Sequence, residues 1–225
     1  MSDTAPRVVL VHGAVERKSG FDRVLPLLED LDVTTYDRRG HGDRWEEGPA
    51  SLGADIDELL AVVGRRRATV VGHSLGGLVV LGASLQRPEQ FAAIGLFETA
   101  IPWGDWWTAR DRASMMNEID HNAAAAHEGP AAQRLRLEVA WASCRNEVLD
   151  AFSAPFRWQD ATVPVVTGFG ASSRGNSARD ASIVADAYGI AAVVLDDAGH
   201  RAHWSAPGAF ADFVRRCVRY GGAPA

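Results

Sequence analysis

The chain has 225 residues, of which 47% are hydrophobic and 23% are charged, with a formal net charge of −6. These values suit one globular domain with room for an insertion, and the acidic balance excludes nucleic acid or an anionic membrane as the expected main partner. The opening residues lack a signal-peptide pattern, no apolar run nears the roughly 18 residues that span a bilayer, and two cysteines are too few for a disulfide framework, so we expect a cytoplasmic protein with free thiols.

Short apolar runs rich in β-branched residues recur along the chain, and each is followed by a turn. Because these runs are apolar throughout rather than alternating, they fit strands that are covered on both faces of a parallel sheet. Amphipathic helical stretches are expected at 52–64 and 207–220. The alternation predicts an α/β fold with a doubly wound, mostly parallel sheet of about six strands. The candidate strands are RVVLV (7–11), VTTYD (33–37), ATVVG (68–72), AAIGLF (92–97), VPVVTG (163–168) and AAVVLD (191–196).

Residues 100–160 interrupt this alternation and hold five of the seven tryptophans. We interpret the segment as an inserted helical cap over the carboxyl edge of the sheet, with 1–99 and 161–225 forming the core. Ligand clefts are lined mostly by apolar and aromatic groups, so some cap residues should bind substrate. The alternative is that the aromatic residues only pack the cap against the core. The candidates for substrate binding are Trp103, Trp106, Trp107 and Met115.

A serine lies between two glycines at the end of the third candidate strand, in GHSLGG (72–77), and a helical stretch follows it. This G-x-S-x-G pattern between a strand and a helix is typical of a nucleophile elbow, in which a sharp turn presents the serine above the sheet. The helix N-terminus behind the turn favours developing negative charge. We therefore expect Ser74 to be a catalytic nucleophile.

A histidine that could serve as the general base follows the last candidate strand. His200 lies in a Gly-His turn within LDDAGHRAHW (195–204), where an imidazole can reach the serine. The neighbouring His203 competes for this role, but we interpret it as a surface residue or a residue that contacts the cap.

Four motifs occur in the order found in the α/β-hydrolase superfamily, and the chain resembles that superfamily along nearly all of the predicted core. They are VVLVHG (8–13), YDRRGHG (36–42), GHSLGG (72–77) and AGHRAHW (198–204). The first candidate strand looks like the family's third, which implies a truncated core.

The resemblance also implies roles for the residues in the turns. It places the oxyanion hole at the backbone N–H groups of Ala14 and Leu75. It gives His12 and His41 a role in shaping turns. The charged turn at Glu16–Lys18 could meet a polar substrate, but we expect it to be a solvated loop.

The triad acid is absent from the turn where most members of this family carry it, because TGFGASSRGNS (167–177) contains no carboxylate, and the neutral Ser172 cannot stabilise an imidazolium as an anion does. Glu98 ends the strand that follows the nucleophile helix, and a charged residue closing an apolar strand needs a partner. The carboxyl ends of neighbouring strands meet at one edge of the sheet, so Glu98 should lie near Ser74. The pattern resembles branches of the superfamily with the acid at this position. The alternatives are Asp196 as the acid, or Glu98 as a salt-bridged hinge residue.

The sequence therefore predicts a serine hydrolase that acts on a small carboxylic ester or lactone through a Ser74–His200–Glu98 triad and an acyl-enzyme. We expect no cofactor and no metal, and TGFGASSRG (167–175) lacks the full dinucleotide-binding pattern. A homodimer remains open. The alternatives on the same triad are a lyase, an acyltransferase or a C–C bond hydrolase. An alternative of another class is a ligand-binding receptor with vestigial turnover.

Overall fold

The computed structural model describes residues 5–126, 131–153, 156–173, 176–190 and 192–222. Its strands form one six-stranded sheet, and every strand pair in it is parallel. The ends of the predicted strands differ from the observed ends by at most two residues; position 191, where one was expected to begin, lies outside the described residues. The strands are β1 (Arg7–Val11), β2 (Asp32–Thr35), β3 (Ala68–His73), β4 (Phe91–Phe97), β5 (Val165–Gly170) and β6 (Val193–Leu195).

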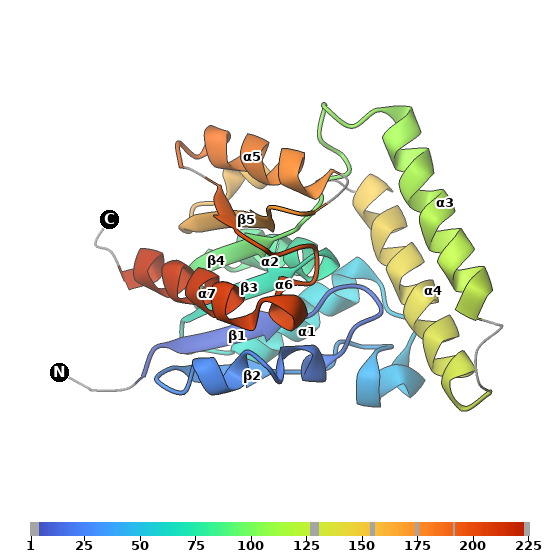
Figure 1. The fold of residues 1–225 in the computed structure, drawn as a ribbon, viewed down its shortest axis with the longest axis horizontal. Helices are drawn as coiled ribbons and strands as arrows, with labels where there is room; N and C mark the ends of the chain where they lie inside the picture. The colour runs from blue at the N-terminus through green and yellow to red at the C-terminus, as the bar shows by residue number, and fades with distance from the viewer. Residues whose placement is uncertain (1–4, 127–130, 154–155, 174–175, 191, 223–225) are drawn as a thin grey trace.

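Helices occupy both faces of the sheet and one end of it (Figure 1). The α-helices are α1 (Leu52–Val63), α2 (Leu75–Gln86), α3 (Ala109–Ala126), α4 (Ala131–Ser153), α5 (Ser177–Ala187), α6 (Ala202–Ser205) and α7 (Pro207–Gly222). Short 3₁₀ helices lie at Lys18–Phe21, Leu25–Leu27, Gly42–Glu47, Pro88–Gln90 and Trp158–Asp160. In the ranges given above, no helix combines the length and the apolar character that crossing a membrane requires.

The two faces of the sheet bury two separate apolar clusters because successive strand residues point to opposite sides. In β1, Val9 packs with residues of α1 and α2, whereas Val8 packs with residues of α7. Both valines are fully buried. The absence of polar alternation in the predicted strands therefore reflects a sheet that is covered on both faces.

The order of the strands is β2-β1-β3-β4-β5-β6, so the chain reverses its direction of travel across the sheet between β1 and β3. In open α/β sheets, ligands bind outside the carboxyl ends of the strands at such a switch point. The register pairs Val11 with Gly72 there, and it pairs His73 with Phe97 on the next strand. The turn after β1, the turn after β3 and the turn after β4 therefore meet at one edge.

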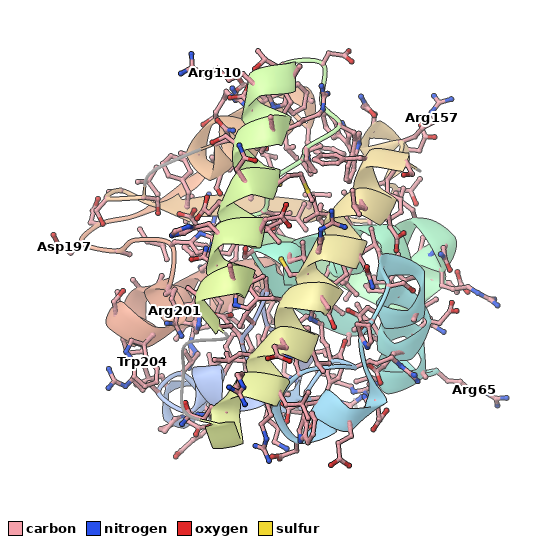
Figure 2. All side chains as sticks on the ribbon, turned by 90° about the vertical axis from the view of Figure 1, so that its right-hand side faces the viewer. Arg65, Arg110, Arg157, Asp197, Arg201 and Trp204 are labelled. Atoms are coloured by element: carbon pink, nitrogen blue, oxygen red, sulfur yellow. The ribbon has the colours of Figure 1, made fainter. Side chains whose placement is uncertain are left out.

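The inserted segment forms two long helices, α3 and α4, which lie side by side next to the carboxyl edge of the sheet (Figures 1 and 2). A buried charge cluster joins α4 to the core. Nη1 of Arg38 lies 2.9 Å from Oε2 of Glu147 on α4 and also contacts Asp55 on α1. All three side chains are fully buried, so the guanidinium holds the helical insertion against the core. The exact boundaries of cap and core stay a prediction.

Candidate active site

Ser74 lies in the sharp turn between β3 and α2, as the G-x-S-x-G pattern predicts. Its φ is +52°, a left-handed conformation that side chains rarely adopt, and its N–H donates to the carbonyl oxygen of Phe97 at 2.8 Å. Glycines allow this turn because a Cβ on Gly72 would lie 2.5 Å from the carbonyl oxygen of Gly76. A Cβ on Gly76 would in turn lie 2.5 Å from the carbonyl oxygen of His12. The strained turn thus presents Ser74 beside the end of β1.

Glu98 lies next to this turn, directly after β4. Because His73 pairs with Phe97 in the register, the residues that follow them, Ser74 and Glu98, end neighbouring strands. Glu98 also has a positive φ, +54°, and its N–H donates to the carbonyl oxygen of Gly168 at 2.9 Å. The sequence analysis placed Glu98 at this edge, and the structure places it there.

The carboxylate of Glu98 is fully buried and contacts the histidine of the last loop. Nδ1 of His200 lies 3.2 Å from Oε2 of Glu98, while the N–H of Gly170 donates to Oε1 at 2.8 Å. The hydroxyl of Ser173 donates to the same Oε1. Burial raises the pKa of Glu98, but these hydrogen bonds lower it by more, so the net pKa lies below its usual range. Glu98 is therefore held as an anion facing the imidazole.

The alternative acid, Asp196, lies in the loop that also carries His200. Asp196 is exposed at the end of β6. Its neighbour Asp197 has a positive φ of +56° and points away from the molecule in Figure 2. Ser172, in the turn where the family usually carries its acid, donates its hydroxyl to the carbonyl oxygen of Ala198 at 2.7 Å.

A cavity of about 650 Å³ opens between the carboxyl edge of the sheet and the helical insertion. Its volume falls within the roughly 300–1,000 Å³ typical of small-molecule sites. Ser74, His200 and Glu98 all lie in its wall, as do Ala14 and Leu75, the two predicted oxyanion-hole residues. The other lining residues are Leu78, Ala100, Pro102, Trp107, Asp111, Ser114, Met115, Glu118, Ile119, Asn122, Trp141, Cys144, Val148, Asn176 and Ser177.

The oxyanion-hole residues suit their expected role by position. Leu75 is the first residue of α2, and the first N–H groups of a helix have no partner within it. Ala14 follows β1 in a turn whose next residue, Val15, has a positive φ of +56°. Of the described residues, the four non-glycine residues with positive φ all follow strands at the carboxyl edge. Backbone strain is thus concentrated where the reactive groups gather.

Two of the four predicted substrate-binding residues line the cavity, and two do not. Trp107 and Met115 are in its wall, whereas Trp103 and Trp106 are absent from it among the described residues. The indole N–H of Trp103 donates to the carbonyl oxygen of Phe156 at 2.9 Å, and that of Trp106 donates to Oδ1 of Asp180 at 2.8 Å. In this structure these two indoles anchor the insertion, which is the alternative the sequence left open.

The sequence analysis missed several residues of the site. Trp141 and Cys144 on α4 and a stripe of α3 that includes Glu118 line the cavity, but the helical stretches gave no sign of which face is turned inward. The thiol of Cys144 is free and buried, as is that of Cys217. Ser173 was one of several serines in its turn, and only the tertiary contact with Glu98 distinguishes it.

Two expectations are wrong: Glu16 does not lie in a solvated loop, and His203, expected at the surface or against the cap, is buried in the core. His203 is fully buried, with its ring centroid 5.3 Å from that of Phe21 and 4.5 Å from that of His73. The side chain of Glu16 is only 9% exposed, and its Oε2 lies 2.9 Å from Nδ1 of His73. Phe21 is the buried residue of the 3₁₀ helix Lys18–Phe21, which the sequence gave no reason to place over α6.

Two other histidines, His12 and His41, make hydrogen bonds with backbone groups. Nε2 of His12 accepts from the N–H of Arg38 at 3.0 Å, and its Nδ1 lies 2.9 Å from the carbonyl oxygen of Gly13. Nδ1 of His41 lies 2.9 Å from the carbonyl oxygen of Arg39. Burial, followed by the charge of Arg38, lowers the pKa of both rings, that of His41 to about 3. Both are neutral rings that hold turns together.

Among the described side chains, one group offers atoms that could hold a metal ion. Glu16, His73 and His203 place their ligand atoms within 4.8 Å of one another. Oε1 of Glu16 also lies 3.2 Å from Nε of Arg201. A guanidinium at this distance repels a divalent cation, so the donor set suits a hydrogen-bonded cluster better than a metal centre.

Comparison with known proteins identifies relatives over most of the chain. The model of the alpha/beta hydrolase family matches residues 8–213. Lipase LipV of Mycobacterium tuberculosis is 30% identical over 150 residues, which cover 64% of this chain and 55% of the lipase. The chain thus spans about half of that relative, and between 30% and 40% of three further curated relatives.

Solved structures share the whole architecture. A thermophilic esterase from Thermogutta terrifontis superposes with a TM-score of 0.76 at 17% identity, covering 98% of this chain and 92% of the esterase. The enol-lactonase from Burkholderia xenovorans LB400 superposes with a TM-score of 0.70 at 21% identity, covering 96% and 92%. Identities this low show a common fold, and a fold does not fix the substrate.

Proposed function

The chain belongs to the alpha/beta hydrolase family, and we propose that it is a serine hydrolase that cleaves a small carboxylic ester or lactone through an acyl-enzyme. The contact between Nδ1 of His200 and Oε2 of Glu98, at 3.2 Å in a cavity wall that also holds Ser74, carries this proposal. The relatives include proteins named as a lipase, an esterase and an enol-lactonase, which supports the class of reaction.

Each group has a defined part in the proposed mechanism. His200 takes the proton from the hydroxyl of Ser74 as the serine oxygen attacks the ester carbonyl carbon. Glu98 keeps the imidazole in the tautomer with hydrogen on Nδ1 and stabilises the imidazolium. The N–H groups of Ala14 and Leu75 donate to the oxyanion that develops on the carbonyl oxygen.

The tetrahedral intermediate then breaks its bond to the alcohol oxygen, and His200 gives the proton to that leaving group. Water, deprotonated by the same histidine, attacks the acyl-serine, and the acid and Ser74 are released. A lactone follows the same course, except that its leaving hydroxyl remains attached to the acyl chain. The proton taken in each half is returned in the same half, so no cofactor is required.

The cavity wall favours an uncharged or cationic substrate over an anionic one. Asp111 and Glu118 contribute carboxylates to the wall, and among the described lining residues there is no lysine or arginine. Leu78 and Val148 add apolar side chains to the lining of the same cavity. A substrate with a free carboxylate would meet like charge, whereas an acyl chain would bury apolar surface.

A fluorophosphonate probe tests this proposal, because it labels only an activated serine. The wild-type protein should be labelled and should release a burst of alcohol from an activated ester, and Ser74→Ala should lose both. Turnover with a panel of acyl-chain lengths and lactones then separates hydrolysis from acyl transfer and from simple binding. Labelling that survives Ser74→Ala, or labelling without turnover of any ester or lactone, would contradict the proposal.

A further inference from the structure

A second carboxylate, Glu16, lies behind the catalytic groups and contacts three of the segments that carry them. Its Oε2 accepts from the N–H of Gly13 at 3.0 Å, one residue before the oxyanion-hole residue Ala14. The same oxygen lies 2.9 Å from Nδ1 of His73, the residue before the nucleophile. Its Oε1 lies 3.2 Å from Nε of Arg201, the residue after the base.

His73 also contacts the backbone of the proposed base, His200. Its Nε2 lies 2.7 Å from the carbonyl oxygen of His200. Both ring nitrogens of His73 therefore face acceptors, a carboxylate on one side and a carbonyl on the other. A neutral imidazole has one N–H and can donate to only one of them. His12 differs, since one of its nitrogens accepts and the other donates.

The charge of Glu16 bears on which contact the ring of His73 makes. Burial lowers the pKa of His73 and the carboxylate of Glu16 only partly opposes this, so the net pKa lies below its usual value and the ring is neutral, with one N–H to donate. Burial raises the pKa of Glu16, but the facing His73 and His203 lower it by more, so the net pKa lies far below its usual range. Glu16 is thus an anion, and its carboxylate favours the tautomer of His73 with the proton on Nδ1, which fixes the orientation of the ring beside the elbow.

The space around the cluster leaves little room for rearrangement. A Cβ on Gly13 would lie 3.0 Å from Nδ1 of His73 and 3.2 Å from Oε2 of Glu16. The buried ring of His203 closes the other side, with its Nε2 3.3 Å from Oε1 of Glu16. A shift of this carboxylate therefore moves the turn after β1, the elbow and the loop of the base together.

We propose that Glu16 is a positioning residue. Through Gly13, His73 and Arg201 it fixes the relative positions of three segments: the oxyanion-hole turn, the nucleophile elbow and the loop that carries the base. This inference rests on the proposed function, since it concerns the same reaction. Glu16 does not touch substrate. It acts on the alignment of groups that must meet in the transition state, where a displacement of about 1 Å can cost roughly 100-fold in rate.

Glu16→Gln is the direct test because it keeps the shape and removes the charge. An amide cannot satisfy the site: with its oxygen towards Gly13 and His73, its nitrogen would face the donor Nε of Arg201, and with the amide reversed its nitrogen would face the N–H of Gly13. We expect kcat per titrated active site to fall about 10- to 100-fold with KM changed by less than about threefold. The rate constant for fluorophosphonate labelling, which needs the same alignment, should fall in parallel.

Two variants keep the test independent of folding. Asp22→Asn removes an exposed acid from the same region and should leave kcat unchanged. Arg201→Gln removes a side chain that is 60% exposed, so the variant should fold, and kcat should fall a few-fold because one contact to Glu16 is lost. A purely structural role for Glu16 would lower the melting temperature and the number of titratable sites without changing kcat per site.

A double-mutant cycle with His73→Gln tests whether the two residues act as one unit. Glu16→Gln and His73→Gln together should cost little more than either alone, whereas independent residues would give additive losses. Wild-type kcat per site retained in both Glu16→Gln and Arg201→Gln would overturn the proposal, as would additive losses. So would a stoichiometric divalent metal in the purified protein whose removal by a chelator abolishes activity. If the wild-type protein shows no Ser74-dependent labelling, the proposed function fails instead.

Discussion

Oε2 of Glu98 lies 3.2 Å from Nδ1 of His200, although 102 residues separate them along the chain. The side chain of His200 is 48% exposed, whereas that of Glu98 is fully buried. In the proposed triad, the acid orients the base from within the protein, and His200 lines the cavity. Glu98 follows β4 rather than β5, and the N–H of Gly170 at the end of β5 donates to its Oε1.

Replacement of this acid by its amide should damage catalysis without damaging the fold. Glu98→Gln keeps the side-chain shape but can hold the imidazole in the wrong tautomer and cannot stabilise the imidazolium. We expect kcat to fall by roughly 10²–10⁴, the scale set by the corresponding change in a serine protease, with little change in melting temperature. Steady-state kinetics and thermal denaturation measure both effects.

Two control variants test the alternatives to Glu98 as the residue that orients His200. Asp196→Asn and Ser172→Ala should each stay within about threefold of the wild-type kcat, since neither side chain contacts His200. Ser173→Ala removes one donor to Glu98 and should cost more than either. If Asp196→Asn were damaging and Glu98→Gln mild, the acid assignment would be wrong.

Substrate preference should depend on the cavity wall rather than on every tryptophan of the insertion. Trp141 lines the cavity, so Trp141→Ala should change the ratio of kcat/KM between short and long acyl chains by roughly tenfold. Trp106 binds Asp180 instead, and Trp106→Ala should lower kcat/KM uniformly or lower only stability. A panel of acyl esters measures both. The opposite outcome, a chain-length effect only in Trp106→Ala, would mean that the substrate occupies a different part of the insertion.

The fold and the meeting of Ser74, Glu98 and His200 at one edge of the sheet could be predicted because their signals are local. Each strand is one apolar run, and Ser74, Glu98 and His200 each follow such a run, so the parallel topology brings them to one edge. The contact of Glu16 with His73 joins residues 57 positions apart and depends on how a loop folds back. Likewise, the rotation of α4 decides whether Trp141 faces the cavity. A single sequence holds no local signal for either.

Asp180 fixes the segment that leads into the insertion. Its carboxylate is fully buried and accepts from the N–H of Ile101 at 2.7 Å and from the indole N–H of Trp107 at 2.8 Å, besides that of Trp106. Asp180→Ala would leave these donors without an acceptor, at a cost on the order of 2–4 kcal/mol in the free energy of unfolding.

Urea denaturation measures this cost. Asp186→Ala, an exposed acid on the same helix, should stay within about 0.5 kcal/mol of the wild type. Equal stability of the two variants would show that the indoles find other acceptors.

The charge cluster that joins α4 to the core should make stability depend on pH. Two buried carboxyl groups, Asp55 and Glu147, share one guanidinium, that of Arg38. Burial is the main cause that raises the pKa of Glu147, to about 8, and the charge of Arg38 only partly opposes it. Because the folded-state pKa lies above the unfolded value, the folded protein binds the proton more tightly. The stabilisation is therefore complete below the unfolded pKa and is lost as the pH rises through 8.

Glu147→Gln removes this ionisation while keeping an acceptor for Arg38. Between pH 7 and 9, the wild-type free energy of unfolding should fall by about 1 kcal/mol more than that of Glu147→Gln, as linkage gives for a pKa near 8. Urea denaturation at both pH values measures the difference between the two proteins, which cancels the contribution of the buried histidines. Glu138→Gln changes an acid on the same helix and should keep the wild-type pH dependence. If Glu147→Gln and the wild type lost stability in parallel, Glu147 would be ionised throughout, and the guanidinium of Arg38 would balance both carboxylates in the folded protein.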